Sequence, residues 1–116
     1  MEMAYTELNA QLCAFLDKTP NSFFAVKNIK EELAAHGFTE LQENSRWQLQ
    51  EGGKYYASRN GSALLAFVIP KMDYLGFQVY ACHCDSPAFK LKNNAEMMVD
   101  KKYVKLNVEK YGGMLL

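Results

Sequence analysis

One short segment gathers several side chains that could bind a metal. Residues 81–87 read Ala-Cys-His-Cys-Asp-Ser-Pro and follow a run of apolar residues. Residues two apart in an extended strand point the same way, so His83 and Asp85 should share one face, and Cys82 and Cys84 the other. A histidine can bind zinc through one ring nitrogen while a carboxylate accepts a hydrogen bond from the other. The spacing makes His83 a candidate metal ligand and Asp85 its candidate catalytic support.

Two other interpretations of this segment stay open. In one, His83 is an ordinary hydrogen-bonded histidine at a strand end, and Asp85 caps the Ser-Pro turn that follows. In the other, the two cysteines and the histidine between them form a soft zinc or redox site. Structural zinc sites usually take four ligands in spaced pairs, and the remaining candidates, Cys13 and His36, fall in expected helices. The His-x-Asp spacing alone does not decide the matter, because such short patterns often arise by chance.

The elements that must position this segment begin with a helix. Apolar residues recur at three- and four-residue steps, which predicts a helix over about residues 3–17. These residues are Tyr5, Leu8, Leu12, Phe15 and Leu16.

A second helix is expected after Asn21 or Ser22, either of which can cap it. Gly37 should end the helix in a left-handed conformation, with Phe38 folding back on Leu33. The stripe expected to be buried consists of Val26, Ile29 and Leu33.

Strands should follow the second helix. Residues 39–53 are polar and predict a connection with at most one short strand, around Arg46–Leu49, while Trp47 should cover the core edge. Two strand-like runs, 54–59 and 62–69, are joined by Asn-Gly, a strong hairpin signal. The second of these runs is apolar on both faces, which predicts a central strand.

The candidate ligand should stand at the end of another strand. Residues 77–83 predict an interior strand, and α/β sheets bind ligands at the carboxyl ends of their strands. Residues 88–92 and 102–109 alternate apolar and polar side chains, so each should be a strand with one wet face. The fold class is therefore α/β, mixed α and β, with helices packed on a sheet.

The charge balance excludes two classes of partner. Thirteen Lys and Arg residues match thirteen Asp and Glu residues, so no positive excess attracts nucleic acid or an anionic membrane. The longest apolar run, Ala63 to Ile69, has seven residues, far fewer than the roughly 20 needed to span a bilayer.

The sequence also indicates a compartment. The N-terminus carries acids where a signal peptide needs basic residues, and three cysteines, two of them one residue apart, suit a reducing environment. We therefore expect a cytoplasmic protein. The last residues run through Gly112-Gly113 into apolar residues without a charged tail, from which we expect a piece of a longer chain.

Taken together, several segments resemble the M18 metallopeptidase family, the aspartyl aminopeptidases and their bacterial relatives. They keep their order along nearly the whole chain, so they are more specific than the His-x-Asp pair. The matching stretches are Phe15 to Val26, Gly37-Phe38, Leu41, Trp47, Gly52 to Tyr56, Arg59-Asn60, His83 to Pro87 and Val108 to Gly113.

This resemblance implies an enzyme that removes one N-terminal residue, often an acidic one, from peptides at a site with two zinc ions. The family's zinc-binding histidine maps onto His83 and its supporting aspartate onto Asp85. The bridging carboxylate, the general-base glutamate and the other ligands lie downstream in the family and not within these 116 residues, so we expect the chain alone to be inactive. Cys84 stands where relatives often have threonine, and we expect little consequence because its side chain should point away from His83.

The resemblance also implies two domains and assembly into homo-oligomers. Residues 1–90 would be the N-terminal part of the catalytic domain, and residues 91–116 the start of an inserted β-rich domain that mediates oligomer assembly. An alternative is an α/β interaction domain that kept the scaffold without the metal site. Further Asp, Glu and His ligands beyond residue 116 would favour the enzyme.

Overall fold

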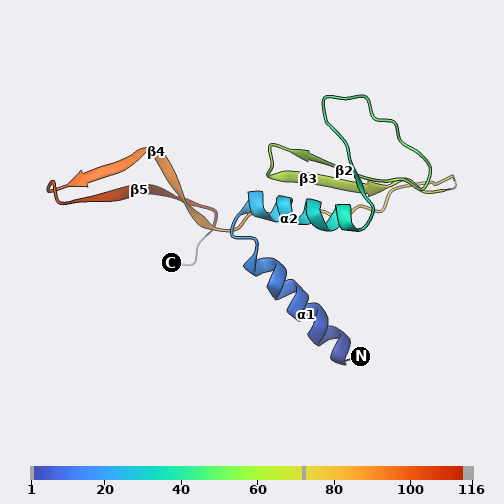
Figure 1. Cartoon of the computed structure of the whole chain (residues 1–116), viewed down its shortest axis with the longest axis horizontal. Helices are drawn as coiled ribbons and strands as arrows, with labels where there is room; N and C mark the ends of the chain where they lie inside the picture. The colour runs from blue at the N-terminus through green and yellow to red at the C-terminus, as the bar shows by residue number, and fades with distance from the viewer. Residues whose placement is uncertain (1, 72, 114–116) are drawn as a thin grey trace. The chain divides into compact units, whose positions relative to one another are not determined.

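Two helices open the chain in the computed structural model, which describes residues 2–71 and 73–113 (Figure 1). Helix α1 spans Glu2–Asp17 and helix α2 spans Ser22–Ala35. Both predicted helices are thus confirmed. Of the α1 stripe, four side chains are exposed, namely Tyr5, Leu8, Leu12 and Leu16.

Local side-chain and backbone bonds fix both ends of α2. The Asn21 side-chain oxygen accepts hydrogen bonds from the backbone N–H groups of Phe23 and Phe24, at 3.0 and 3.2 Å. At the other end Gly37 has a φ of 81°, and the Phe38 N–H donates to the Leu33 carbonyl at 3.0 Å. These are the capping and Schellman contacts that the sequence predicts.

A three-stranded sheet follows α2. Its strands are β1 (Thr39–Glu40), β2 (Lys54–Arg59) and β3 (Ala63–Val68), in the order β1-β2-β3. Strand β1 runs parallel to β2, and β3 runs antiparallel to it. Asn60 and Gly61 join β2 to β3 with φ of 52° and 66°, the left-handed pair that a tight two-residue hairpin turn requires. The predicted hairpin is confirmed.

The core is small and lies on both faces of this sheet, one packed against α2 and the other covered by the connection between β1 and β2. Its buried apolar residues are Ala25, Val26, Tyr55, Tyr56 and Ala57. Of the predicted α2 stripe, Val26 is buried, whereas Ile29 and Leu33 are half-buried. On β2, Tyr55 and Tyr56 point to opposite faces of the sheet because side chains alternate along a strand.

The polar connection between β1 and β2 covers part of the sheet through Trp47. Its indole ring stacks on Phe67 with centroids 6.1 Å apart, and its N–H donates to the Gln42 carbonyl at 2.9 Å. Trp47 lies at the core edge, as predicted.

The same connection forms an ion pair with β2. Arg59 and Glu43 lie 2.6 Å apart, and the Glu43 carboxylate raises the pKa of Arg59 above its ordinary value.

Two of the strand predictions in this region were wrong. The short strand is at Thr39–Glu40 and not at Arg46–Leu49, because the chain that leaves α2 pairs directly with β2. The next residue, Leu41, donates its N–H to the Tyr56 carbonyl at 2.7 Å. Strand β3 is not central: β2 is, and β3 is at the edge of the described sheet. Apolar residues on both faces of a strand do not show how many other strands pair with it.

The expected interior strand over residues 77–83 is also not formed. The segment has no strand partner within the described residues, and Phe77, Val79 and Tyr80 are 83, 77 and 86% exposed. A β-prone sequence becomes a strand only where another strand accepts its backbone hydrogen bonds. The prediction was therefore wrong, because no second strand pairs with this segment within the described residues.

The chain divides into two compact units, residues 1–85 and residues 86–116. The second unit contains an antiparallel hairpin of β4 (Ala88–Val99) and β5 (Tyr103–Tyr111). Both strands were predicted, and both are longer than expected. A register shift between Leu91 and Glu96 interrupts the pairing.

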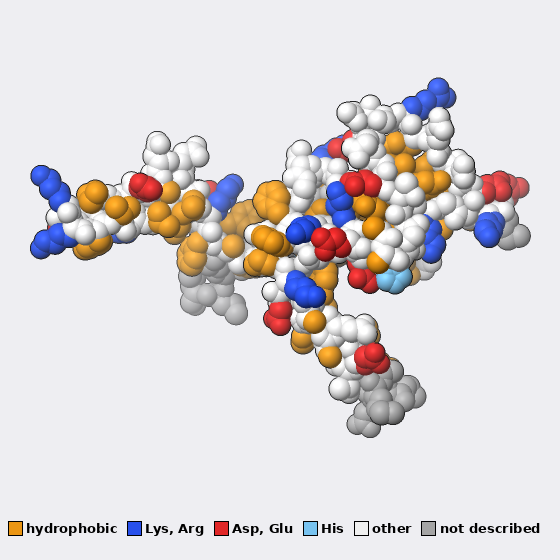
Figure 2. Space-filling model, in the orientation of Figure 1, with side chains coloured by type: hydrophobic (Ala, Val, Ile, Leu, Met, Phe, Trp, Pro, Cys, Tyr) orange, Lys and Arg blue, Asp and Glu red, His pale blue; other side chains and the backbone are white. Residues whose placement is uncertain are grey.

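One face of the β4–β5 hairpin is largely apolar. Directly paired residues share a face, and the pairs Leu91–Val108 and Met98–Val104 stand on the same face as Leu106. Among the paired residues, Phe89 extends this row, and Glu96 and Lys110 are its polar members. All six apolar side chains are exposed, and Figure 2 shows hydrophobic side chains along the hairpin with basic side chains at its tip.

Candidate metal centre

The ring of His83 is held by the residue two positions further along the chain. Its Nδ1 atom lies 2.8 Å from the backbone oxygen of Asp85 and 3.1 Å from the Asp85 Oδ1 atom. Both partners are hydrogen-bond acceptors, so the proton of the neutral ring belongs on Nδ1. The lone pair is then on Nε2, the nitrogen that a metal would use.

The ligating side of the ring is accessible. The His83 side chain is 82% exposed and the Asp85 side chain 43%. An incoming ion can therefore reach Nε2 while Asp85 keeps its contact with Nδ1. A carboxylate in this position orients the ring and increases the basicity of the ligating nitrogen.

The two neighbouring thiols do not join the ring in one site. The Sγ atom of Cys84 donates to the Ser62 carbonyl at 3.2 Å and is half-buried, whereas Cys82 is exposed. No group of three or more His, Cys, Asp and Glu side chains is placed to hold a metal ion among the residues that the structure describes. This arrangement argues against the soft zinc site formed by Cys82, His83 and Cys84.

The donors present fit part of a zinc site. His83 offers a neutral imidazole nitrogen with its tautomer fixed, which is the form that zinc binds. The described residues do not complete a group of three such ligands around it. His83 can therefore hold a zinc ion only together with ligands from outside this part of the chain.

The second histidine has a structural role. His36 caps the C-terminal end of α2, and its Nδ1 atom lies 2.8 Å from the Glu32 backbone oxygen and 3.4 Å from the Glu32 carboxylate. A cationic or hydrogen-bonding ring at this end complements the helix dipole.

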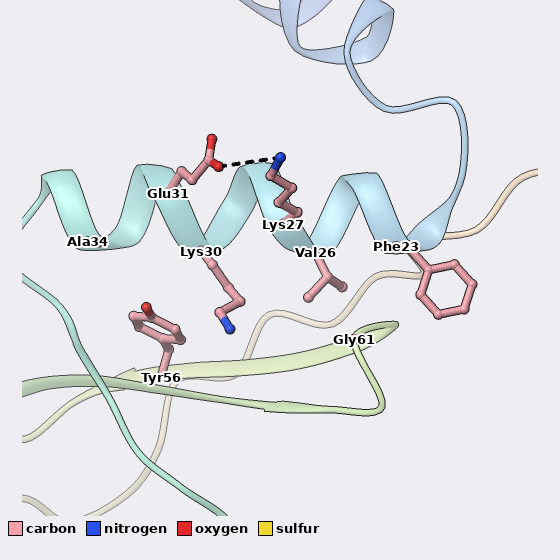
Figure 3. A pocket seen from close by; sticks show the side chains of 8 residues that line it. All are labelled: Phe23, Val26, Lys27, Lys30, Glu31, Ala34, Tyr56 and Gly61. Atoms are coloured by element: carbon pink, nitrogen blue, oxygen red, sulfur yellow. Dashed lines mark ion pairs between the residues drawn. The ribbon is translucent and has the colours of Figure 1, made fainter.

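A groove of about 490 Å³ lies between α2 and the β2–β3 hairpin (Figure 3). Val26 and Tyr56 line it, and Lys30 reaches across it, 6.0 Å from the Tyr56 ring centroid and 2.6 Å from Glu40. Lys27 and Glu31 form an ion pair on the outer side of the helix. The groove marks where α2 packs on the hairpin, and none of its lining residues belongs to the segment that carries His83.

Sequence reasoning missed the contact between Cys84 and Ser62. The alternation of an extended chain sends Cys84 away from His83, but the side chain was expected to have little consequence. No local signal in the sequence could have found this contact, because Cys84 and Ser62 are 22 positions apart.

Known proteins are similar to nearly the whole chain. A family model described as aminopeptidase I zinc metalloprotease (M18) matches residues 15–116. Proteins of Clostridium novyi and Clostridium acetobutylicum, both named probable M18 family aminopeptidase 2, are 43 and 41% identical over 91 and 95% of this chain. The alignments cover 25 and 26% of those relatives, so the chain spans about a quarter of their length.

Solved structures agree with the sequence relatives. The structure of the yeast mApe1 dodecamer matches with a TM-score of 0.79 and 29% identity, over 97% of this chain and 27% of that one. This similarity covers the helices, the sheet and the segment that carries His83. The chain therefore belongs to the M18 family of aminopeptidase I zinc metalloproteases.

Proposed function

We propose that the protein, at the length of its relatives, is a zinc-dependent aminopeptidase that hydrolyses the N-terminal residue from peptides. The observation that carries this proposal is the double contact of His83 Nδ1 with Asp85, which leaves Nε2 for a metal. Membership of a family described as zinc metalloproteases supports the same conclusion. Peptides whose first residue is acidic are the substrates that we expect.

His83 and Asp85 have different tasks in this proposal. His83 is a zinc ligand, and Asp85 is its support, which keeps the proton on Nδ1 and the ring in one orientation. The site is expected to hold two zinc ions, and bound zinc polarises a carbonyl and makes water a stronger nucleophile. The other ligands and the general base belong to residues beyond these 116.

The two domains expected from the sequence have separate proposed roles. Residues 1–90 belong to the catalytic domain, and residues 91–116 open a β-rich domain that mediates homo-oligomer assembly. One similar structure is a dodecamer, and the apolar face of the β4–β5 hairpin is exposed.

No helix in residues 2–71 and 73–113 is long and apolar enough to cross a membrane. We also propose a cytoplasmic location.

The test is to count zinc ions per subunit in the full-length enzyme and to measure hydrolysis of an acidic aminoacyl substrate. His83→Ala should lose one zinc ion and nearly all activity, because it removes the imidazole that binds the zinc. His36→Ala is the matched control, since it removes a histidine from a helix end and should keep both zinc and activity.

Two results would overturn the proposal. Full zinc content in His83→Ala would remove His83 from the site. A full-length protein without zinc and without peptidase activity would favour the interaction domain that kept only the scaffold.

A further inference from the structure

The segment that carries His83 has few contacts to hold it in place. Residues 77–83 form no strand pairing within the described chain, and Phe77, Val79 and Tyr80 are largely exposed. A metal ligand must nevertheless be held within a fraction of an ångström of its working position. Some contact near His83 must therefore fix the backbone.

Cys84 supplies such a contact. Its thiol donates to the Ser62 carbonyl at 3.2 Å, across 22 positions of sequence. Cys84 and Asp85 are half-buried, whereas the preceding residues of the segment are exposed. The chain thus meets the sheet at the residue between the candidate ligand and its support.

The acceptor of this bond is on a rigid element. Ser62 directly follows the hairpin turn, and its N–H donates to the Arg59 carbonyl at 3.2 Å. The turn residues Asn60 and Gly61 are in the left-handed region, and the next position, Ala63, is paired with Arg59. The Ser62 carbonyl is therefore held by the β2–β3 hairpin, where it accepts the hydrogen bond from the Cys84 thiol.

We propose that Cys84 is a positioning residue of the metal site, which ties the His83–Asp85 pair to the β2–β3 hairpin through its hydrogen bond to Ser62. This inference rests on the proposed zinc-binding role of His83. Cys84 itself does not bind the metal, because its thiol is engaged with the Ser62 carbonyl. Its effect on the site is carried by the backbone between residues 83 and 85.

The first test measures zinc affinity by chelator competition in the full-length enzyme. Cys84→Ala removes the donor and should weaken zinc binding about three- to tenfold, the range that one lost hydrogen bond produces. Cys84→Ser keeps a donor and should restore most of the affinity. Cys82→Ala removes an exposed thiol from the same segment and should change nothing.

Helical content and thermal stability of each variant show whether Cys84→Ala still folds.

A second test needs no substitution. It measures the alkylation rate of each thiol in the metal-free 116-residue chain by peptide mapping. Cys84 should react several-fold more slowly than Cys82 and Cys13, because it is half-buried and hydrogen-bonded.

Two results would refute the positioning role. One is an unchanged zinc affinity in the Cys84→Ala variant, when that variant folds and the separate His83→Ala variant loses zinc. The other is a Cys84 thiol that reacts as fast as Cys82. If His83→Ala keeps its zinc, the zinc-binding proposal itself has failed, and the two failures are thereby told apart.

Discussion

Asp85 meets the ring of His83 twice, through its backbone oxygen at 2.8 Å and its carboxylate at 3.1 Å from Nδ1. The two contacts differ in what a substitution can remove. The backbone contact survives any change of side chain, so it preserves the tautomer. The carboxylate contact carries the negative charge that makes Nε2 a stronger ligand.

Asp85→Asn should therefore weaken zinc binding without abolishing it. The asparagine oxygen and the backbone oxygen can still accept from Nδ1, but the charge is lost, and we expect a decrease in affinity or turnover of about 10- to 100-fold. Chelator competition on the full-length enzyme measures it. Asp73→Asn removes the same charge from the loop before the segment and should have no effect. Equal affinities for the two variants would show that Asp85 does not support the ligand.

The 116-residue chain alone should show no aminopeptidase activity on chromogenic amino-acid substrates, with or without added zinc. One imidazole and one supporting carboxylate cannot hold a metal in an open catalytic geometry, which takes about three protein ligands. The measurement is substrate hydrolysis by highly purified chain, with the full-length enzyme as the positive control. Zinc-dependent turnover by the chain would mean that the site has been misplaced.

The sequence predicted best where the determinants are local. The α2 boundaries follow from Asn21 and Gly37, and the hairpin from Asn60 and Gly61, because capping and turn conformations depend on a few adjacent residues. The contact between His83 and Asp85 is of the same kind, since it joins residues only two positions apart.

The failures concern pairing partners. Residues 77–83 have strand-forming side chains, but a ladder needs a second strand, and the described residues provide none. Strand β1 was missed because two residues carry almost no pattern, and its position is set by where α2 ends. The Cys84–Ser62 bond joins residues 22 positions apart, which no local pattern encodes.

Gly61→Ala tests the turn that fixes the Ser62 carbonyl. Gly61 has a φ of 66°, and an added Cβ would meet only the Phe23 ring, at 3.6 Å, which is an ordinary contact. The cost is therefore in the backbone, about 1–2 kcal/mol of unfolding free energy. Gly76→Ala is the control, because its φ is not in the left-handed region and its Cβ would meet open space. Urea unfolding followed by circular dichroism measures both, and equal losses would contradict the assignment of the turn.

The last prediction concerns the apolar face of the β4–β5 hairpin. A two-stranded hairpin with an uncovered apolar face is marginally stable in water, and large exposed apolar patches tend to be covered by other protein surfaces. We therefore expect the 116-residue chain to self-associate as its concentration rises.

Leu106→Lys should reduce this association, because it places a charge in the middle of the row formed with Met98, Val104 and Val108. Asn107→Lys adds the same charge at the next position, whose side chain points to the opposite face, and should leave association unchanged. Size-exclusion chromatography with light scattering over a range of concentrations compares the two variants with the parent chain. If both lysines reduce association equally, net charge and not the apolar face controls it; if neither does, the association surface lies elsewhere on the chain.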